Sequence, residues 1–448
     1  MTITTQEIEF LVNQYQDELK ELADTIWEYA EVCFEEFSSS RLQMESLKQH
    51  GFTAEIPCSS LPTAFLAKWG SGHPVVGLLG EYDALPGLSQ KADTPYPAPP
   101  DASPQTAAME KSDSCGHGCG HNLLGTAALG AALAVKDYLE KNQLPGTIIY
   151  YGCPAEENVA GKARMLECGF FEGTDVCFTW HPHYKPGLLN NSLANYRVSY
   201  HFHGTSAHAS QSPHMGRSAL DACELMNIGV NYLREHMIDE ARIHYAYINA
   251  GGTAPNIIPA DAEVIYAIRA PRTDQAEMLK NRVDNIARGA ALMTETTVET
   301  DVKCIYESFL PNPVLDNLVL KYLEAFTPVA YTEEELAYAA RFVPVGNLPD
   351  TDIPMDAEPD LSADRKTGFS TDAGNVSQKI PSSGFMVNCY ANGSPLHHWS
   401  VTAQGKSSIA HKGMLTASKI MAGAAAELFT CPEIAAKASN KSSEKGRD

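Results

Sequence analysis

The stretch CGHGCGHNLLG, residues 115–125, places two cysteines, two histidines and four glycines within eleven positions. Thiolate and imidazole are ligands that zinc and related ions accept. The glycines would let the backbone turn tightly enough to bring such ligands together. A flexible glycine loop with incidental thiols has the same composition. The stretch therefore raises a metal site as a hypothesis, with Cys119 and His121 as candidate ligands.

The segments on either side of this stretch alternate between strand and helix patterns. Before it, PVVGLLGEYDAL (74–85) is an apolar run that ends in acidic residues, and 88–113 is rich in proline, alanine and serine, as a long loop is. After it, 122–146 predicts a helix of small residues and TIIYYGCP (147–154) a buried strand. This alternation predicts an α/β domain with a mixed, mostly parallel sheet flanked by helices.

The pattern changes near residue 194. NYRVSYHFHG alternates apolar and polar residues, and a helix, two strands, a helix around 274–293 and a last strand follow. This β-α-β-β-α-β order predicts a ferredoxin-like α+β domain inserted at 194–309. The first domain would then consist of 1–193 and 310–448.

The second part of the first domain is less regular. It contains a strand in GFMVNCYA (384–391) and a helix at 411–429, but the segment 327–367 has no clear motif. The polar tail from about 436 is expected to be disordered.

Composition limits the class of protein. The 448 residues include 33 basic and 55 acidic side chains, giving a net charge of -22, which argues against nucleic acid and anionic membranes as partners. We find no signal peptide and no apolar run of membrane-spanning length. The eleven cysteines are scattered and odd in number, which favours a cytoplasmic protein with free thiols.

Two consecutive carboxylates follow the predicted strand at 147–154. Because open α/β sheets keep their sites at the carboxyl ends of strands, Glu156 and Glu157 are candidates for such a site. One carboxylate can bind a metal while the other acts as general base on a water. Acidic residues are also common at a solvated helix N-terminus, so both interpretations stay open.

Histidines and an aspartate complete the set of candidates. His181 ends the apolar run DVCFTW, and His397 and His398 follow another predicted strand. Each histidine has an ordinary explanation as a packed or surface residue. Asp83 would either orient a histidine ligand or cap a turn. Ligands dispersed over about 280 residues, together with carboxylates, are typical of a catalytic metal site and unlike a small structural zinc domain.

The inserted domain carries further polar candidates. A histidine and an amide, His208 and Asn256, can polarise a scissile carbonyl, and Arg269 can hold a carboxylate. Taken alone, each of these three residues is unremarkable. The loop FSTDAGNVSQKIP (369–381) could bind an anion through its backbone N–H groups or be an ordinary loop.

The motifs from GEYDALPGLSQ (80–90) to PLHHWSVTAQGKSSIAHKGM (395–414) carry a family resemblance. In content and order they resemble the metal-dependent aminoacylase and carboxypeptidase G superfamily, within it the aminoacylase, amidohydrolase and auxin-conjugate-hydrolase branch. The resemblance covers about 75–430. It implies a catalytic domain with two divalent metal ions, manganese or zinc with cobalt as an alternative, and a smaller lid domain that mediates dimerisation.

The resemblance also implies roles for individual residues. The positions that match metal ligands are Cys119, His121, Glu157, His181 and His397. Glu156 matches the general base, and Asp83 is assigned as the partner that orients a histidine ligand. His208 matches the lid histidine, which in related dimers reaches the neighbouring subunit, and Asn256 and Arg269 match substrate-contacting positions.

Two departures from the branch bear on these roles. Asn122 stands where the branch often has aspartate, as in its aminobenzoyl-glutamate subgroup, and His398 beside His397 leaves the last ligand ambiguous. The subgroup enzyme has two kinds of subunit, so a paralogous partner is expected as an alternative to a homodimer.

The function expected from these observations is hydrolysis of the amide bond of a small N-acyl or N-aroyl amino acid, similar to p-aminobenzoyl-glutamate. Metal would acidify a water, Glu156 would take its proton, and His208 would help to stabilise the oxyanion. The alternatives are a dipeptidase or aminopeptidase, another C–N hydrolase such as a deaminase, and a relative that only binds.

Overall fold

The structure is a computed structural model that describes residues 3–99, 114–346, 355 and 368–445. Parts of two segments singled out above, 88–113 and 327–367, lie outside the described residues.

The chain divides into two compact units. One, the sheet unit, consists of Met1–Asn190, Leu310–Arg365 and Val376–Asp448, and the other, the inserted unit, consists of Asn191–Phe309 and Lys366–Asn375. The inserted domain expected at 194–309 falls within the inserted unit. The inserted unit also includes the short segment Lys366–Asn375, which comes later in the chain. No sequence pattern predicted that this segment belongs to the inserted unit.

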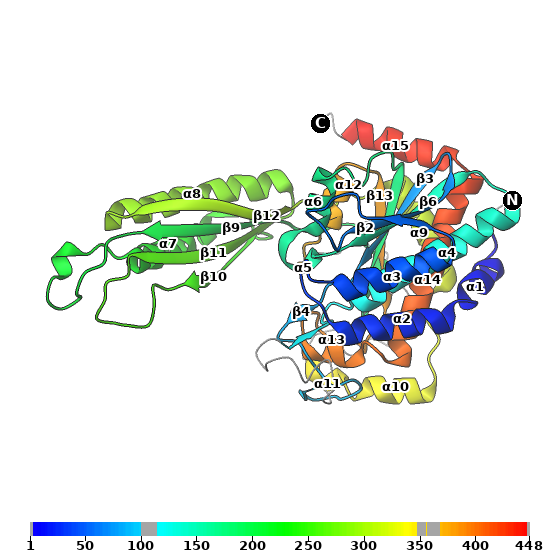
Figure 1. The fold of residues 1–448 in the computed structure, drawn as a ribbon, viewed down its shortest axis with the longest axis horizontal. Helices are drawn as coiled ribbons and strands as arrows, with labels where there is room; N and C mark the ends of the chain where they lie inside the picture. The colour runs from blue at the N-terminus through cyan, green and yellow to red at the C-terminus, as the bar shows by residue number, and fades with distance from the viewer. Residues whose placement is uncertain (1–2, 100–113, 347–354, 356–367, 446–448) are drawn as a thin grey trace. The chain divides into compact units, whose positions relative to one another are not determined.

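The sheet unit is built on a seven-stranded sheet with a parallel centre (Figure 1). From edge to edge its strands are β1 (Thr53–Glu55), β2 (Phe65–Ser71), β6 (Gly146–Cys153), β3 (Val75–Glu81), β7 (Val176–His183), β13 (Ser382–Asn388) and β8 (Gly187–Leu188). β6, β3, β7 and β13 pair in parallel, while β1, β2 and β8 pair antiparallel. Every residue of β6 and β13 is buried, as expected for strands covered on both faces. The predicted mixed sheet is confirmed.

Helices complete this unit, and several of them pack on the sheet and share its core. They are α1 (Thr5–Asn13), α2 (Gln16–Tyr29), α3 (Phe37–Gln49), α4 (His121–Asn142), α5 (Glu156–Val159), α6 (Gly161–Glu167), α9 (Pro313–Phe326), α10 (Glu333–Ala340), α11 (Val343–Gly346), α13 (Trp399–Gln404), α14 (Ser408–Thr430) and α15 (Glu433–Lys445). A short ladder, β4 (Leu85–Pro86) with β5 (Cys115–Gly116), leads into α4, and α12 (Ala373–Ser377) crosses the boundary between the units.

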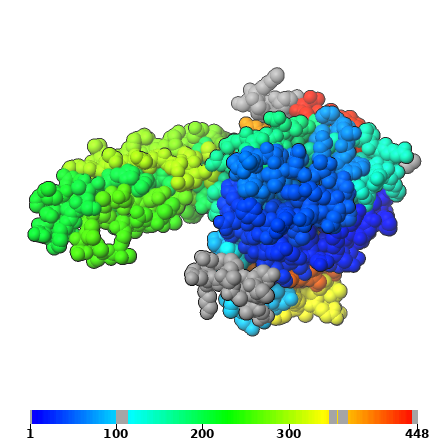
Figure 2. Space-filling model, viewed as in Figure 1, coloured from blue at the N-terminus to red at the C-terminus, as the bar shows by residue number. Residues whose placement is uncertain are grey.

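The central helix α4 is buried on nearly all sides because its residues are small. At Gly130 an added Cβ would lie 2.6 Å from a methyl of Leu19 in α2, so a larger residue would force the Leu19 side chain to shift. On α14, the Ser418 hydroxyl donates to the Ala127 carbonyl of α4 at 2.9 Å. The N-terminal helices, blue in Figure 2, form a continuous part of the surface of this unit.

The inserted unit is a four-stranded antiparallel sheet with two helices on one face (Figure 1). Its elements follow the chain as β9 (Ala194–His203), α7 (Ala219–Leu233), β10 (Arg242–Asn249), β11 (Asp261–Ala270), α8 (Thr273–Thr294) and β12 (Thr297–Tyr306). The strand order β10-β11-β9-β12 is that of a ferredoxin-like fold, as predicted. Its core is separate from that of the sheet unit.

Two segments are more regular than the sequence suggested. The tail from about 436, expected to be disordered, is helical in α15 as far as Lys445. Ala435 and Ala438 are buried there, and the Asn312 side chain donates to the Ala438 carbonyl at 3.0 Å, so tertiary contacts offset its polar composition. Within 327–367, α10 begins at a capping box formed by Thr332 and Glu335.

Two of the general expectations can be compared with the structure. None of the described helices has both the length and the apolarity needed to cross a lipid bilayer. No disulfide joins any of the eleven cysteines, all of which the structure describes.

Candidate metal centre

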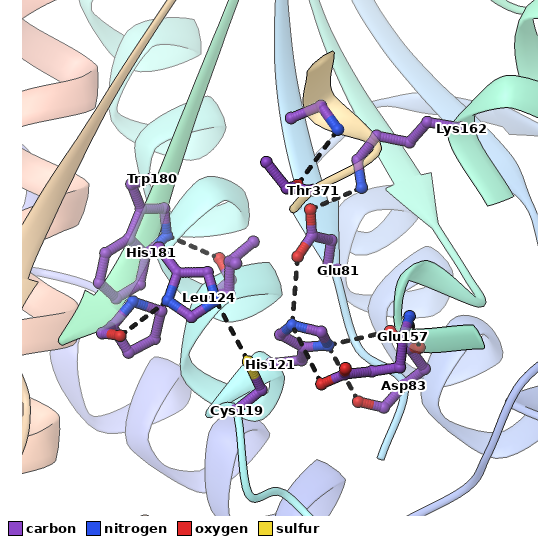
Figure 3. A network of polar contacts seen from close by, with 12 residues as sticks. Glu81, Asp83, Cys119, His121, Leu124, Glu157, Lys162, Trp180, His181 and Thr371 are labelled. Carbon is purple, nitrogen blue, oxygen red and sulfur yellow. Dashed lines mark hydrogen bonds and ion pairs between the residues drawn. The ribbon is translucent and has the colours of Figure 1, made fainter. Parts of the chain in front are cut away.

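The metal-ligand candidates of the sheet unit lie together where its parallel strands end. Figure 3 shows four of them, Cys119, His121, Glu157 and His181. Asp83 follows β3, Glu157 follows β6, and His181 lies near the end of β7. Cys119 and His121 come from the turn into α4, where Gly120 has a φ of +80°. An added Cβ at Gly120 would lie 1.9 Å from the Tyr390 hydroxyl, so this turn requires glycine.

Five of these side chains form two groups that share one cysteine. Cys119 with His121 and His181 is one group, and Cys119 with Glu157 and His397 is the other, with the ligand atoms of each group within 4.8 Å of one another. The Cys119 sulfur lies 3.3 Å from His181 Nε2. His397 Nε2 lies 3.3 Å from a carboxylate oxygen of Glu157.

Hydrogen bonds orient two of the histidines. Asp83 Oδ1 lies 2.9 Å from His121 Nδ1, and its other oxygen accepts a bond from the Glu157 backbone N–H at 2.9 Å. His181 Nδ1 lies 2.7 Å from the Pro182 carbonyl. Both acceptors favour a proton on Nδ1, so a neutral ring would present its Nε2 lone pair to the cluster, as a metal ligand requires.

The residues present fit a divalent metal. His121 Nε2 and Glu157 Oε1 are buried atoms with no hydrogen-bond partner among the described residues, and their side chains are 0% and 4% exposed. Buried polar atoms are nearly always satisfied, so these two atoms, with a Glu81 carboxylate oxygen only 3.3 Å from His121 Nε2, require an explanation. A cation between sulfur, nitrogen and oxygen donors supplies one, since this donor set is that of zinc and neighbouring ions.

The charges of the cluster depend on one another. Burial alone would raise the pKa of the Cys119 thiol, but the charge of His181 and close contacts with His121, His181 and His397 hold that pKa well below its usual value. Burial and the Cys119 charge raise the pKa of Glu157 to about 7. Hydrogen bonds to Cys119 and Glu157 raise the pKa of His397 to about 11. The thiolate is thus favoured, which is the form that binds metal.

Sequence reasoning missed a buried ion pair beside this cluster. Lys162 Nζ lies 2.5 Å from Glu81 Oε1, and the two side chains are 0% and 3% exposed. The other oxygen of Glu81 lies 3.3 Å from His121 Nε2, and Glu81, His121 and Glu156 form a third group with ligand atoms within 4.8 Å. Glu81 stood out in the sequence only as a neighbour of Asp83, and no pattern links it to Lys162, which is 81 residues away.

Glu156 is the first residue of α5 and is buried. It follows Ala155, whose φ of 58° turns the chain from β6 into the helix. Glu36 stabilises this turn, because its carboxyl accepts a bond from the Ala155 N–H at 2.9 Å. Burial and the charge of Asp83 raise the pKa of Glu36 to about 8.

Three polar residues near the candidate ligands have structural contacts instead. His117 is buried, with Nε2 3.0 Å from the Ile26 carbonyl, and burial lowers its pKa to about 4. The Asn122 amide donates to the carbonyls of Ala23 and Gly405, so it ties α4 to neighbouring segments. His398 caps α13 by accepting from a backbone N–H, which leaves His397 as the histidine in the cluster.

The remaining candidates, His208, Asn256 and Arg269, belong to the inserted unit. His208 pairs with Ile257 in a short bridge, and the Ala209 N–H donates to the Asn256 carbonyl at 3.0 Å, so these two loops lie side by side. The Arg269 guanidinium lies 3.4 Å from the Ser370 hydroxyl.

Comparison with known proteins identifies the family. Residues 190–294 match the peptidase dimerisation domain of the M20 family. Over 435 residues the chain is 43% identical to one of the subunits of p-aminobenzoyl-glutamate hydrolase from Escherichia coli (strain K12), and the match covers 91% of this chain and 88% of that protein. The chain belongs to the M20 peptidase family.

Other M20 relatives agree in sequence and fold. An Xaa-Arg dipeptidase of Mus musculus is 29% identical over 403 residues, or 85% of this chain and 80% of that protein. A dinuclear metal-binding M20 peptidase of Bacillus subtilis superposes with a TM-score of 0.58 at 18% identity, over 93% of this chain and 99% of that chain. As an M20 member, the chain is a hydrolase that acts on amide bonds.

Proposed function

We propose that this M20 hydrolase cleaves the amide bond of an N-acyl or N-aroyl amino acid, with p-aminobenzoyl-glutamate as the first substrate to test. The observation that carries the proposal is the buried cluster around Cys119, with Glu156 at its edge. The substrate class is supported by the identity to a relative named for p-aminobenzoyl-glutamate.

We further propose that the cluster holds two divalent ions, manganese or zinc, with cobalt as an alternative. Cys119 would be common to both, with His121 and His181 on one side and Glu157 and His397 on the other. Bound metal supplies an acidified water and polarises the substrate carbonyl.

The chain's own residues would complete the reaction. Glu156 would accept a proton from the water nucleophile and later donate it to the leaving amine. Its burial beside Glu81 keeps bulk water from competing for that proton. In the inserted unit, His208 and Asn256 would stabilise the oxyanion and Arg269 would bind the substrate carboxylate.

The test is amino-acid release from a substrate panel. Purified full-length chain is stripped with a chelator and divided among buffers with manganese, zinc, cobalt or no metal. The panel pairs p-aminobenzoyl-glutamate, N-benzoyl and N-acetyl amino acids with the corresponding free dipeptides, including Xaa-Arg peptides. We expect release from the N-blocked substrates only after metal is returned. Cleavage confined to free dipeptides would replace the proposal with a dipeptidase, and release that survives complete metal removal would contradict the metal role.

We propose that the chain forms a homodimer through residues 190–294, because this segment matches a dimerisation domain. The alternative is a complex with a paralogous second subunit, because the bacterial relative is named as a subunit. Light scattering of the purified chain distinguishes a dimer from a monomer that needs a partner. We propose a cytoplasmic location, because the eleven cysteines that the structure describes form no disulfide with one another.

A further inference from the structure

A second cluster of metal-ligand side chains lies on the inserted unit, on the sheet face opposite its helices. Along β9, Val198, Tyr200 and Phe202 are fully buried in the core of this unit. Because successive strand residues point to opposite faces, His201 and His203 project from the other face. Asp261 is the direct neighbour of His203 on β11.

These three side chains already lie at ligand distances. His203 Nδ1 is 2.9 Å and His201 Nε2 is 3.6 Å from the same carboxylate oxygen of Asp261. The two imidazole centroids are 4.1 Å apart, and the three ligand atoms lie within 4.8 Å of one another. Ligand atoms of a tetrahedral zinc ion, with bonds of about 2.1 Å, are themselves about 3.4 Å apart. An ion therefore requires only small side-chain adjustments.

The surroundings of the cluster are acidic. Glu263 on β11 and Glu299 on β12 are the cross-strand neighbours of His201 on either side. His203 Nε2 is a buried atom with no hydrogen bond to a described residue, and it lies 3.9 Å from Glu299. Carboxylates on both sides favour a cation, and two imidazoles select a late first-row transition ion over magnesium or calcium.

We propose that His201, His203 and Asp261 form a binding site for a zinc-like transition ion. All three belong to the inserted unit, whereas the Cys119 cluster belongs to the sheet unit. The ion would join β9 to β11 through side chains as well as through the backbone ladder. This inference does not rest on the proposed function, since it concerns metal bound outside the residues assigned to catalysis.

The test counts metal, not turnover. Wild-type chain, the double variant His201→Ala/His203→Ala and the control His244→Ala are dialysed against a series of buffered free zinc concentrations, and bound zinc per chain is measured by mass spectrometry. His244 is an exposed histidine on β10 of the same sheet and outside the cluster. We expect the double variant to bind one zinc fewer per chain than the wild type and the control. Equal zinc counts in all three proteins at every concentration would overturn the proposal.

A second variant guards against a folding artefact. Asp261→Asn keeps the shape of the side chain and removes its charge, so it should weaken the extra zinc at least about 10-fold without changing the circular dichroism spectrum. If the Asp261→Asn protein binds the extra zinc as tightly as wild type, the assignment of Asp261 as a ligand is wrong.

A separate observation concerns two thiols of the sheet unit. Cys58, in the loop between β1 and β2, and Cys168, at the end of α6, have sulfur atoms 2.7 Å apart. Both residues are half-buried, so small oxidants can reach them. The hydrogen bond between Cys58 and Cys168 lowers the pKa of Cys58, which favours the reactive thiolate.

We propose that Cys58 and Cys168 form a reversible disulfide when the protein meets a peroxide. The two thiols lose two protons and two electrons as the S–S bond forms, and hydrogen peroxide takes up both as its O–O bond breaks, giving two waters. The metal-loaded chain is treated with hydrogen peroxide, blocked with N-ethylmaleimide, digested and examined by mass spectrometry.

The expected product is a linked pair of peptides that contain Cys58 and Cys168 and that separate again after dithiothreitol. The linked pair should be absent from Cys58→Ser and present in the control Cys431→Ser, which removes another half-buried thiol. Peroxide-treated wild type in which both cysteines still carry N-ethylmaleimide, with no linked peptide, would overturn the proposal.

Discussion

Replacement of Lys162 by methionine tests the buried ion pair beside the metal cluster. Lys162 and Glu81 are 0% and 3% exposed, and their charged atoms are 2.5 Å apart. Methionine keeps most of the aliphatic volume but removes the lysine cation from the buried Glu81 carboxylate, whose other oxygen still lies 3.3 Å from His121 Nε2. Loss of one partner of a buried pair costs about 3–5 kcal/mol. We therefore expect the free energy of unfolding to fall by about that amount.

The double variant Glu81→Gln/Lys162→Met separates charge from packing. It removes both charges and retains the methionine, so we expect it to lose less than half as much stability as Lys162→Met alone. The matched control is Lys136→Met. Lys136 also pairs with an acidic neighbour, Asp137, at 3.3 Å but lies closer to solvent, so its loss should cost at most about 1 kcal/mol.

Urea unfolding followed by tryptophan fluorescence measures these differences. All four tryptophans, Trp27, Trp69, Trp180 and Trp399, belong to the sheet unit, so their signal follows the unit that holds the ion pair. The proteins are compared without metal to keep binding energy out of the result. A Lys162→Met protein within about 1 kcal/mol of wild type, or a double variant as unstable as the single one, would refute the reasoning.

Three further predictions concern the metal cluster and its support. Glu156→Ala should abolish amide hydrolysis while the metal content stays that of wild type. An active Glu156→Ala variant would contradict the assignment of Glu156 as general base. Asp83→Asn should weaken zinc binding about 10- to 100-fold in competition with a chelator, because it loses the charge that orients His121. The pKa of Glu36 is about 8 in the folded state against an ordinary value of 4.5, so the unfolded state releases this proton first. Wild-type stability should therefore fall relative to Glu36→Gln as the pH rises from about 4.5 to 8, and parallel denaturation midpoints over that range would contradict the raised pKa.

The part of the fold that follows hydrophobic periodicity could be predicted from the sequence. The alternation in NYRVSYHFHG becomes β9, whose apolar residues fill the core of the inserted unit. The run 74–85 becomes β3, which ends at Glu81. Because parallel strands end at the same edge, these predictions also bring Asp83, Glu157 and His181 together without knowledge of their contacts.

Other features depend on tertiary contacts that leave no local pattern. The polarity of the tail indicated disorder, but Ala435 and Ala438 are buried and α15 forms. The choice between His397 and His398 depends on which ring faces Glu157, and only the structure shows that His398 caps α13. The capping box at Thr332 was a local signal that could have indicated α10.

The order of the strands has a consequence for synthesis of the chain on the ribosome. The inserted unit's strands, β9 to β12, are complete once Tyr306 has been made, whereas β13, which lies between β7 and β8, ends only at Asn388. Until then β7 has an unpaired apolar edge, and His397 is still absent. We expect nascent chains that stall between these two points to carry all four strands of the inserted unit together with an open sheet in the other unit, and to depend on chaperones at that stage.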